Sequence, residues 1–341
     1  YLILLILYIM KRLILLIILI CSIISANAQI AILEHAGASS VYTGTNALVN
    51  AYDAAVNQDI IYLGGGTFTA TVLNKTISIY GAGYHPDATG VTGKTYIYSS
   101  TTIGESATSL KLEGVEINGS LTVSAEGVVV KSCKFNGCTL NSNNSSLINN
   151  LVLGAIACNN ASSNHLISNN IMTAGIQSIS NSTITNNVIR GIVGSYSANR
   201  RYIWGDNNNI YNNICCDATE SYIYEVVTGN NNTIHHNVCW HSKITNDNAG
   251  NIETDNTKID DAARASLFVK VPTDRTWRWD DDYHLATNYT GSDDTPVGIY
   301  GGDYPMRAYY LPSTPHLVSN NSSVKSDVEG KLNISVTFQA Q

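Results

Sequence analysis

The sequence lacks runs of basic residues, and this absence limits the partners that we expect. Lysine and arginine together number 19 against 26 aspartates and glutamates, which gives a formal net charge of -7. Removal of Lys11 and Arg12 with the leader described below changes that charge to -9. Nucleic acids and anionic membrane surfaces recruit clustered basic residues, so we expect neither as a partner.

The chain also lacks a pair of CxxC motifs with a histidine partner, the spacing typical of a structural zinc site. We therefore expect no metal and no cofactor. Six cysteines follow residue 28, and the adjacent Cys215 and Cys216 cannot easily bond to each other. Export permits disulfides, yet a chain of this length does not need them, so bridges and buried free thiols both remain open. The six are Cys133, Cys138, Cys158, Cys215, Cys216 and Cys239.

The first 28 residues have the pattern of a secretion signal. A basic pair, Lys11-Arg12, precedes an apolar run from Leu13 to Ile24 and the small-residue cleavage site Ala26-Asn27-Ala28. Residues 1–9 are interpreted as an upstream extension. A retained membrane anchor is the alternative, because the combined apolar stretch is long enough to cross a bilayer. We expect export to the cell envelope or the exterior, with no stable membrane span after cleavage.

A short motif of the form Ile/Leu-x-Asn/His-Asn-Ile/Leu/Val occurs five times in the middle of the chain. Successive second asparagines are 17 to 26 residues apart. A period near 20 residues without a helical stripe predicts a solenoid whose turns add short strands to long parallel sheets. The regular apolar flanks argue against a disordered asparagine-rich segment. The copies are Leu147–Leu151, Ile167–Ile171, Ile184–Val188, Ile210–Ile214 and Ile234–Val238, after two degenerate copies at Leu112–Val115 and Val130–Cys133.

The asparagines of this motif suit the corners of such a solenoid. Asparagine tolerates the left-handed backbone conformation that a sharp corner requires. Its amide can also bond the same amide one coil above and one coil below, so that stacked asparagines form a ladder of otherwise unpaired polar groups. The apolar residues on either side are then expected to point into the interior.

Upstream and downstream segments add a start and an end to the solenoid. A helix is expected around Thr45 to Asn57, where Leu48, Val49, Tyr52 and Val56 form an apolar stripe. Near the end, Asp282–Leu285 and Val297–Gly302 are interpreted as the final coil and its cap, with Asp282 and His284 structural rather than catalytic. Residues 306–341 are expected to form a tail with one strand, Leu332–Phe338, that packs back on the body or pairs with a neighbour.

From about Thr45 to Val238, the chain resembles the right-handed parallel β-helix proteins of the pectin-lyase-like superfamily, specifically exported bacterial members. The resemblance rests on the helix leading into Asp59–Phe68, on Ile77–Gly83 and on the asparagine repeats. A second match near the end resembles the closing segment of such proteins and covers Asp282–Leu285, Val297–Gly302 and Tyr304-Pro305. It implies an all-β fold, a right-handed parallel β-helix over residues 29–305 with a short N-terminal capping helix, followed by the C-terminal cap and tail strand.

Superfamily members that cleave acidic polysaccharides need identifiable catalytic groups. Lyases use an arginine or lysine base near carboxylates that hold calcium, and hydrolases use a pair of carboxylates. The polygalacturonase pattern of Asn-Thr-Asp, Asp-Asp, Gly-His-Gly and Arg-Ile-Lys is missing from the recognisable coils, and Asp260-Asp261 and Asp281-Asp282 lie beyond them. The sequence therefore leaves open whether the protein is an enzyme, with a polysaccharide lyase or glycoside hydrolase as one alternative.

The two longest repeats, between Asn187 and Asn237, carry a mixture of charged and aromatic residues on loops that must leave the cylinder. Aromatic faces stack on sugars, and charged side chains bond their hydroxyls or carboxylates. We expect an exported β-helix protein that binds or processes a polysaccharide, and a structural or adhesive surface protein is the alternative. Taken singly, each residue could instead be structural. The candidate ligand-binding residues are Arg200, Arg201, Tyr202, Trp204, Asp206 and Trp240, and weak catalytic candidates are Arg190, Glu220 and His235.

Overall fold

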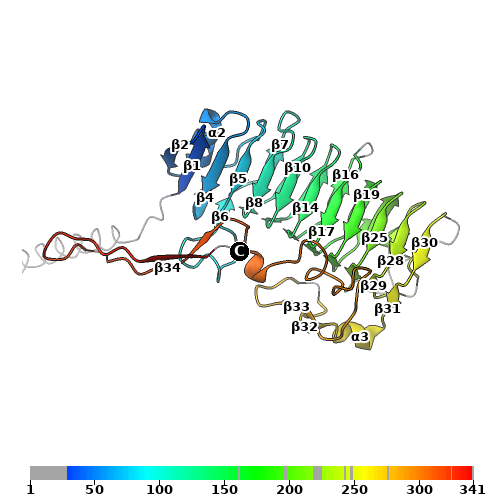
Figure 1. The fold of residues 1–341 in the computed structure, drawn as a ribbon. Coiled ribbons are helices and arrows are strands. Elements are labelled where there is room, and N and C mark those ends of the chain that lie inside the picture. Colours follow the sequence, from blue (N-terminus) through cyan, green and yellow to red (C-terminus); the bar gives the residue numbers. More distant parts are fainter. Residues whose placement is uncertain are drawn as a thin grey trace, which may run out of the picture.

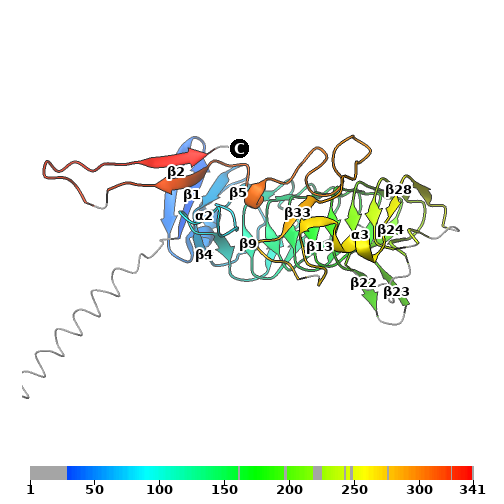
Figure 2. The same ribbon diagram turned by 90° about the horizontal axis from the view of Figure 1, so that it is seen from below.

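The computed structural model describes residues 29–159, 162–195, 198–217, 225–241, 243–245, 249–274, 276–323 and 325–339. The predicted leader, residues 1–28, lies outside them. Figure 1 and Figure 2 show an elongated stack of coils, a segment that returns along the outside of the stack, and a tail that projects from it. In the described part, no helix is both long and apolar enough to cross a bilayer.

Three long sheets form the stack. Sheet A runs in the order β2 (Ala38–Thr43), β1 (Ile30–His35), β3 (Ile60–Leu63), β5 (Ser78–Tyr80), β8 (Lys111–Glu113), β11 (Val129–Lys131), β14 (Ser146–Ile148), β17 (Leu166–Ser168), β20 (Thr183–Thr185), β25 (Asn209–Tyr211), β28 (Thr233–His235), β30 (Ile252–Thr254). Sheet B contains β4 (Gly66–Phe68), β6 (Thr95–Ile97), β9 (Glu116–Ile117), β12 (Lys134–Phe135), β15 (Leu151–Val152), β18 (Ile171–Met172), β21 (Val188–Ile189), β26 (Ile214–Cys215), β29 (Val238–Cys239), β31 (Thr257–Lys258). Sheet C contains β7 (Thr101–Ile103), β10 (Ser120–Val123), β13 (Gly137–Leu140), β16 (Ile156–Cys158), β19 (Ile176–Ser180), β24 (Ile203–Asp206) and β27 (Val227–Thr228).

From β5 to β27 each coil contributes one strand to each sheet, and from β3 to β30 consecutive strands of sheet A pair in parallel. Ile184 of β20, for example, pairs with Ile167 below it and Ile210 above it, and all three side chains are buried. This register confirms the predicted all-β solenoid with aliphatic residues filling the interior. Parallel strands joined by such crossovers wind right-handed in almost all proteins, which is the handedness expected from the sequence.

The N-terminal end of the stack is covered by helix α2 (Ala47–Ala54) and by the antiparallel pair β1 and β2. Leu48, Ala51 and Tyr52 of α2 are buried, so the predicted capping helix is confirmed. The helix is shorter than expected: Val56, the last member of the predicted stripe, follows its end and is exposed.

One corner of the stack has the predicted asparagine ladder. The Asn187 Nδ2 donates to the Asn213 Oδ1 at 2.9 Å, and the Asn187 Oδ1 accepts from the Asn170 backbone N–H at 2.9 Å. The preceding residue in each copy adopts a positive φ, as at Asn186 with φ 54° and, in the last copy, at His236. In the second degenerate copy, Val130–Cys133, Cys133 occupies the ladder position, and its thiol donates to the carbonyl oxygens of Leu112 and Lys131. The ladder comprises Asn150, Asn170, Asn187, Asn213, Asn237 and Asn256.

A second polar column, which was not predicted from the sequence, lies at the corner that leads into sheet A. Asn208 donates its Nδ2 to the Asn232 Oδ1 at 3.0 Å, and Asn232 bonds Asn251 in the same way. Lower coils use shorter or different side chains: His165 donates its backbone N–H to the Ser182 Oγ at 2.9 Å. Because the residue type changes along this column, no fixed motif marks it.

The segment after the last coil does not form the expected final coil. The stack ends with β30 and β31, and residues 266–315, named the return strap here, run back along its outside toward the N-terminal end (Figure 1). Asp282–Leu285 is strand β33, which pairs antiparallel with β32 (Phe268–Lys270) away from the three long sheets. The strap also contains the 3-10 turn η2 (Ala308–Tyr310), and a short helix, α3 (Asp261–Ala265), precedes it.

The first asparagines of the Asn-Asn corners hold the strap on the stack. Asn169 donates its Nδ2 to the carbonyl oxygens of Ile299 at 3.0 Å and Gly301 at 2.8 Å. Asn212 accepts at its Oδ1 from the Ser292 backbone N–H at 2.9 Å. The Asn-Asn pair therefore has two functions: the second asparagine forms the internal ladder and the first binds the strap.

The tail is a hairpin rather than a single strand. Strand β34 (His316–Asn320) pairs antiparallel with β35 (Val336–Gln339), and the hairpin projects from the N-terminal end of the stack (Figure 2).

All six cysteines after residue 28 are buried free thiols. Of the two alternatives left open by the sequence, disulfide bridges and buried free thiols, the structure shows free thiols.

Candidate functional site

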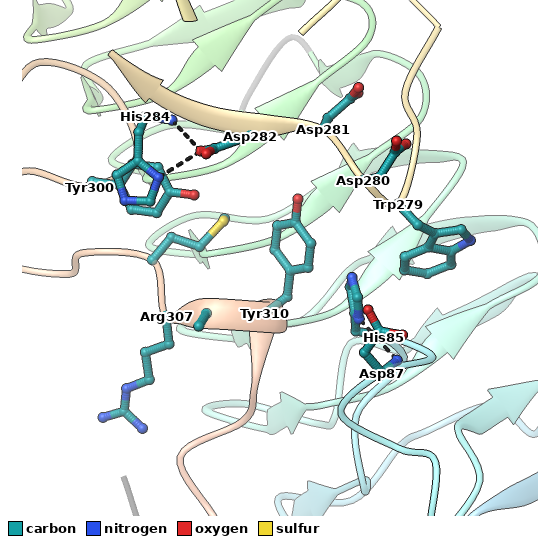
Figure 3. Close-up of a pocket in the computed structure, with 12 residues that line it drawn as sticks. His85, Asp87, Trp279, Asp280, Asp281, Asp282, His284, Tyr300, Arg307 and Tyr310 are labelled. Atoms are coloured by element: carbon teal, nitrogen blue, oxygen red, sulfur yellow. Dashed lines mark hydrogen bonds and ion pairs between the residues drawn. The ribbon is translucent and has the colours of Figure 1, made fainter. Parts of the chain in front are cut away.

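A cavity of about 520 Å³ lies between the return strap and the loop that joins β5 to β6. We call it the strap pocket. The loop contributes His85 and Asp87, and the strap contributes the remaining side chains from residues 279–284 and 300–310. Figure 3 shows Tyr310 between the His284 and Tyr300 rings on one side and the Trp279 and His85 rings on the other. The lining residues are His85, Asp87, Trp279, Asp280, Asp281, Asp282, His284, Tyr300, Met306, Arg307, Ala308 and Tyr310.

Aromatic rings form much of the pocket wall. The Tyr310 ring stacks on the buried ring of Tyr84, with centroids 5.8 Å apart and planes at 18°. The Trp279 ring packs edge-on against Trp277 at 4.4 Å and against His85 at 5.0 Å. Trp279 nevertheless keeps 36% of its surface exposed. These contacts hold the indole in place while part of it stays accessible to a ligand.

Carboxylates from three consecutive strap residues surround these rings, and each has its own partner. Asp280 pairs with the Lys270 ammonium at 2.6 Å, and Asp282 pairs with the His284 imidazole at 2.6 Å. The backbone hydrogen bond from His284 and the contact with its ring lower the pKa of Asp282. Burial instead raises the pKa of Asp281, although Arg190 lies 3.7 Å from it. The three acids thus differ in protonation behaviour because their surroundings differ.

The other titratable groups of the pocket are shifted by burial. Loss of solvent lowers the pKa of His85, which favours the neutral imidazole at pH 7. Burial raises the pKa of Tyr300 to about 12 and that of Tyr310 further, so both phenols stay protonated and can donate hydrogen bonds. The Tyr300 ring stacks on His284 at 4.0 Å with planes 9° apart.

Arg190, a predicted catalytic candidate, is fully buried beneath the strap. Its Nε lies 2.7 Å from the Asp217 carboxylate, and its Nη1 donates to the Tyr283 hydroxyl at 3.0 Å. Its Nη2 donates to the carbonyl oxygen of Pro272. Because its donors bind strap and coil groups, Arg190 fastens the strap, and a glycan would have to displace those groups to reach it.

Two of the predicted ligand-binding residues, Trp204 and Asp206, lie on β24 of sheet C and form, with the adjacent Arg201, a separate surface that we call the sheet C face. The Arg201 guanidinium lies 4.9 Å from the centroid of the Trp204 ring, and Trp204 is 43% exposed. Asp206 is exposed and accepts from the Asn230 backbone N–H at 2.7 Å. Tyr202 is fully buried, and Arg200 is partly buried. The structure therefore brings Arg201 and Trp204 together and places Tyr202 in the core.

The remaining candidates do not join either site. His235 stacks on Tyr211 at 5.1 Å, and its Nδ1 lies 3.1 Å from the Nδ1 of His236. Trp240 is buried, and its indole N–H donates to the Asp261 carboxylate at 2.9 Å. Glu220 lies outside the described residues. Arg190 and His235 do not meet, because each contacts a different set of neighbours.

The pocket residues from the strap were not predicted as a site. The run Trp277-Arg278-Trp279-Asp280-Asp281-Asp282-Tyr283-His284 is the densest mixture of aromatic and charged residues in the strap, and that density was the available signal. Only its last part, from Asp282, was interpreted, as a structural capping strand. Its partners in the pocket, His85 and Asp87, are almost 200 positions earlier, so no local pattern relates them to this run. Within the described residues, no three histidine, cysteine, aspartate or glutamate side chains are grouped so as to hold a metal ion.

Comparisons with protein-family models, with curated proteins and with solved structures give no match. The fold and the geometry of the pocket are therefore the basis of the proposed function.

Proposed function

We propose that this is an exported β-helix protein that binds a polysaccharide, with one or more sugar units held in the strap pocket. The observation that carries the proposal is the fixed, 36% exposed Trp279 ring beside Tyr310 and several carboxylates in a cavity of about 520 Å³. Sugars offer apolar faces that stack on aromatic rings and hydroxyls that donate to carboxylates. A cavity of this volume is in the range of small-molecule sites, large enough for a disaccharide.

Binding is favoured over hydrolysis because of how the acids are arranged. A glycoside hydrolase needs one protonated and one ionised carboxyl group facing the same bond. Asp281 has the raised pKa of a candidate acid, but its Oδ2 accepts from the Arg278 backbone N–H at 2.9 Å and lies 3.7 Å from the Arg190 Nη1. In Figure 3 the Asp281 carboxylate points away from Tyr310. These contacts turn it out of the pocket.

Two matched tryptophan variants test the binding site. Trp279→Ala removes the accessible ring of the strap pocket, and Trp204→Ala removes an equally exposed ring from the sheet C face. Calorimetric titration with a panel of soluble oligosaccharides should show at least a tenfold loss of affinity for Trp279→Ala and little change for Trp204→Ala. The reverse result places the glycan on the sheet C face. A wild-type protein that binds no glycan of the panel contradicts the proposed function.

The same panel tests the alternative of a lyase or hydrolase. We expect no unsaturated products and no new reducing ends after prolonged incubation with the wild-type protein. Product formation that disappears in Asp282→Asn and persists in Asp53→Asn, a substitution of an exposed acid on α2, would show that the pocket is catalytic instead.

A structural or adhesive role is the second candidate, and the tail hairpin favours it. Leu332, Ile334, Val336 and Phe338 alternate with polar residues and are all exposed, which leaves one apolar face of the hairpin uncovered. A two-stranded hairpin is only marginally stable alone in water. If the tail serves assembly, size-exclusion chromatography should show an oligomer that dissociates when residues 316–341 are deleted. A monomer in both cases rejects assembly through the tail, and this deletion spares the pocket.

A further inference from the structure

The lining of the strap pocket has a marked charge asymmetry, and this bears on which sugar it can hold. Four lining residues are aspartates, but Asp281 is buried and turned out of the pocket toward Arg190, which leaves Asp87, Asp280 and Asp282. Their hydrogen bonds and ion pairs lower the pKa values of Asp280 and Asp282, so both are ionised at neutral pH. His85 on the opposite wall is neutral at that pH because burial lowers its pKa. Carboxylates therefore dominate the charge of the wall.

The partner of Asp282, His284, lines the pocket itself, whereas the lysines and arginines near these aspartates lie at the margin or behind the wall. Lys134, whose ammonium is 4.7 Å from the centroid of the Trp279 ring, is not a lining residue and pairs with Glu116. Lys270, the partner of Asp280, is not among the lining residues, and its side chain is 63% exposed. Arg190, near Asp281, is buried on the side of the coils. Arg307 is a lining residue, but in Figure 3 its side chain leads away from Tyr310 and Trp279. It also lines a separate cavity of about 150 Å³ with Lys131. A ligand in the strap pocket thus meets acids more closely than bases.

We propose that the strap pocket binds a sugar unit that bears an amino group, and that it discriminates against uronates. This inference rests on the proposed glycan-binding function and specifies its ligand class. An ammonium beside either Asp87 or Asp282 gains charge-assisted hydrogen bonds, whereas a uronate carboxylate there is repelled and loses its hydration without replacement. Hydroxyl groups donate to the same carboxylates without adding charge. The expected order of affinity is amino sugar, then neutral sugar, then uronate.

This specificity differs from the acidic polysaccharides that some pectin-lyase-like proteins cleave. Those enzymes neutralise a substrate carboxylate with calcium or basic residues. The strap pocket instead presents negative charge beside its aromatic rings, and the strap that supplies most of this charge lies outside the repeats on which the resemblance rests. The pocket is therefore a feature of the strap laid on the coils, not of the coils alone.

The test compares three hexamers of matched length on the full chain: one of glucosamine, one of glucose and one of galacturonate. Calorimetry at pH 6 and low ionic strength should give at least a tenfold tighter binding of the glucosamine hexamer than of the galacturonate hexamer. The glucose hexamer should lie between them. Raising the salt concentration should reduce the ratio, because screening weakens charge interactions at a partly exposed site.

Carboxylate variants identify the source of the preference. Asp87→Asn with Asp282→Asn should bring the glucosamine-to-galacturonate ratio close to one, while Asp53→Asn should preserve it. Asp87→Asn alone gives a milder second measurement if the double variant unfolds early, and it should reduce the ratio severalfold. A ratio that these substitutions leave unchanged contradicts the assignment to the pocket carboxylates.

The outcomes separate this inference from the proposed function. A galacturonate hexamer that binds as tightly as the glucosamine hexamer, with both lost in Trp279→Ala, overturns the amino-sugar preference and leaves glycan binding in the pocket intact. Equal binding of glucosamine and glucose also overturns the preference. Failure of all three hexamers and of the wider panel to bind overturns the proposed function itself.

Discussion

A single ladder asparagine ties three coils together, as Asn187 illustrates. Its Nδ2 donates to the carbonyl oxygens of Ile167 at 2.8 Å and Thr185 at 2.9 Å and to the Asn213 Oδ1 at 2.9 Å. Its Oδ1 accepts from Asn170. A buried amide in such a network stabilises the fold much more than an exposed amide does, because its removal leaves several buried partners with neither a hydrogen bond nor water.

Truncation of this side chain should be costly. We expect Asn187→Ala to lower the free energy of unfolding by about 2–4 kcal/mol, since it leaves buried donors and acceptors unpaired. Asn209→Ala, an exposed asparagine one coil later, is the matched control and should change it by less than about 0.5 kcal/mol. Urea unfolding followed by circular dichroism measures both. Equal effects at the two positions would show that the ladder does not carry this stability.

His165 gives the second column a dependence on pH. Burial lowers its pKa to about 4, while an unfolded histidine titrates near 6.5. The unfolded chain therefore takes up a proton at this residue between about pH 6.5 and pH 4 that the folded protein does not. The free energy of unfolding should fall through that window, by on the order of 2 kcal/mol, and the loss should level off below pH 4.

The variant His165→Asn isolates this effect. Asparagine occupies the equivalent position at Asn208, and its side chain can accept the bond that the Ser145 N–H now donates to the His165 Nδ1. Thermal melts from pH 7 to pH 4 should show a weaker pH dependence in the variant than in the wild type. The same dependence in both proteins contradicts a role for His165.

The two polar columns differ in how far the sequence could predict them. The ladder from Asn150 to Asn256 was largely predictable because one residue type recurs between aliphatic flanks. The second column was not, because a histidine, serines and asparagines share the same position, as His165, Ser182 and Asn208 do. The choice of residue type is narrower at the position just before the column than in the column itself, because the backbone has a positive φ there. Asn164, Asn181 and Asn207 occupy that position.

At the scale of elements, the return strap is the part that builds the pocket and the part that local patterns could not place. Its docking depends on contacts between distant positions: Asn169 binds Gly301, and Glu113 accepts from the Ser313 hydroxyl at 2.7 Å. No periodicity encodes such pairs. Arg190 was a weak catalytic candidate from the sequence, whereas the structure shows a buried cation whose partners all belong to the strap or the next coil.

Removal of Arg190 should release the strap. Arg190→Met leaves Asp217 and Asp281 buried without their cation, and we expect a loss of about 3–5 kcal/mol in the free energy of unfolding. Limited proteolysis should cut within residues 266–315 before it cuts the coils. Arg278→Met removes the exposed pair with Asp274 and an exposed hydrogen bond to the Thr276 carbonyl oxygen, and should cost less than about 1 kcal/mol. A strap that stays protected in Arg190→Met would contradict the anchoring role.

At the scale of the whole molecule, the stack and the strap have different relations to function. Regular coils provide a rigid, elongated support, visible in Figure 1, and the strap adds an irregular surface to one side of it. The sequence predicted the support well because repetition amplifies a weak local pattern over many coils. It favoured the longest repeats as the site, and those repeats form the separate sheet C face instead of the strap pocket.

The most direct test of this account is hydrogen–deuterium exchange on the whole protein with and without the glycan that binds most tightly. Binding in the strap pocket should slow exchange in residues 81–94 and 276–310 together, because the ligand bridges the β5–β6 loop and the strap. Exchange in residues 201–217 and 225–235 should not change. Protection confined to the latter two segments, with none in the strap, would contradict the account.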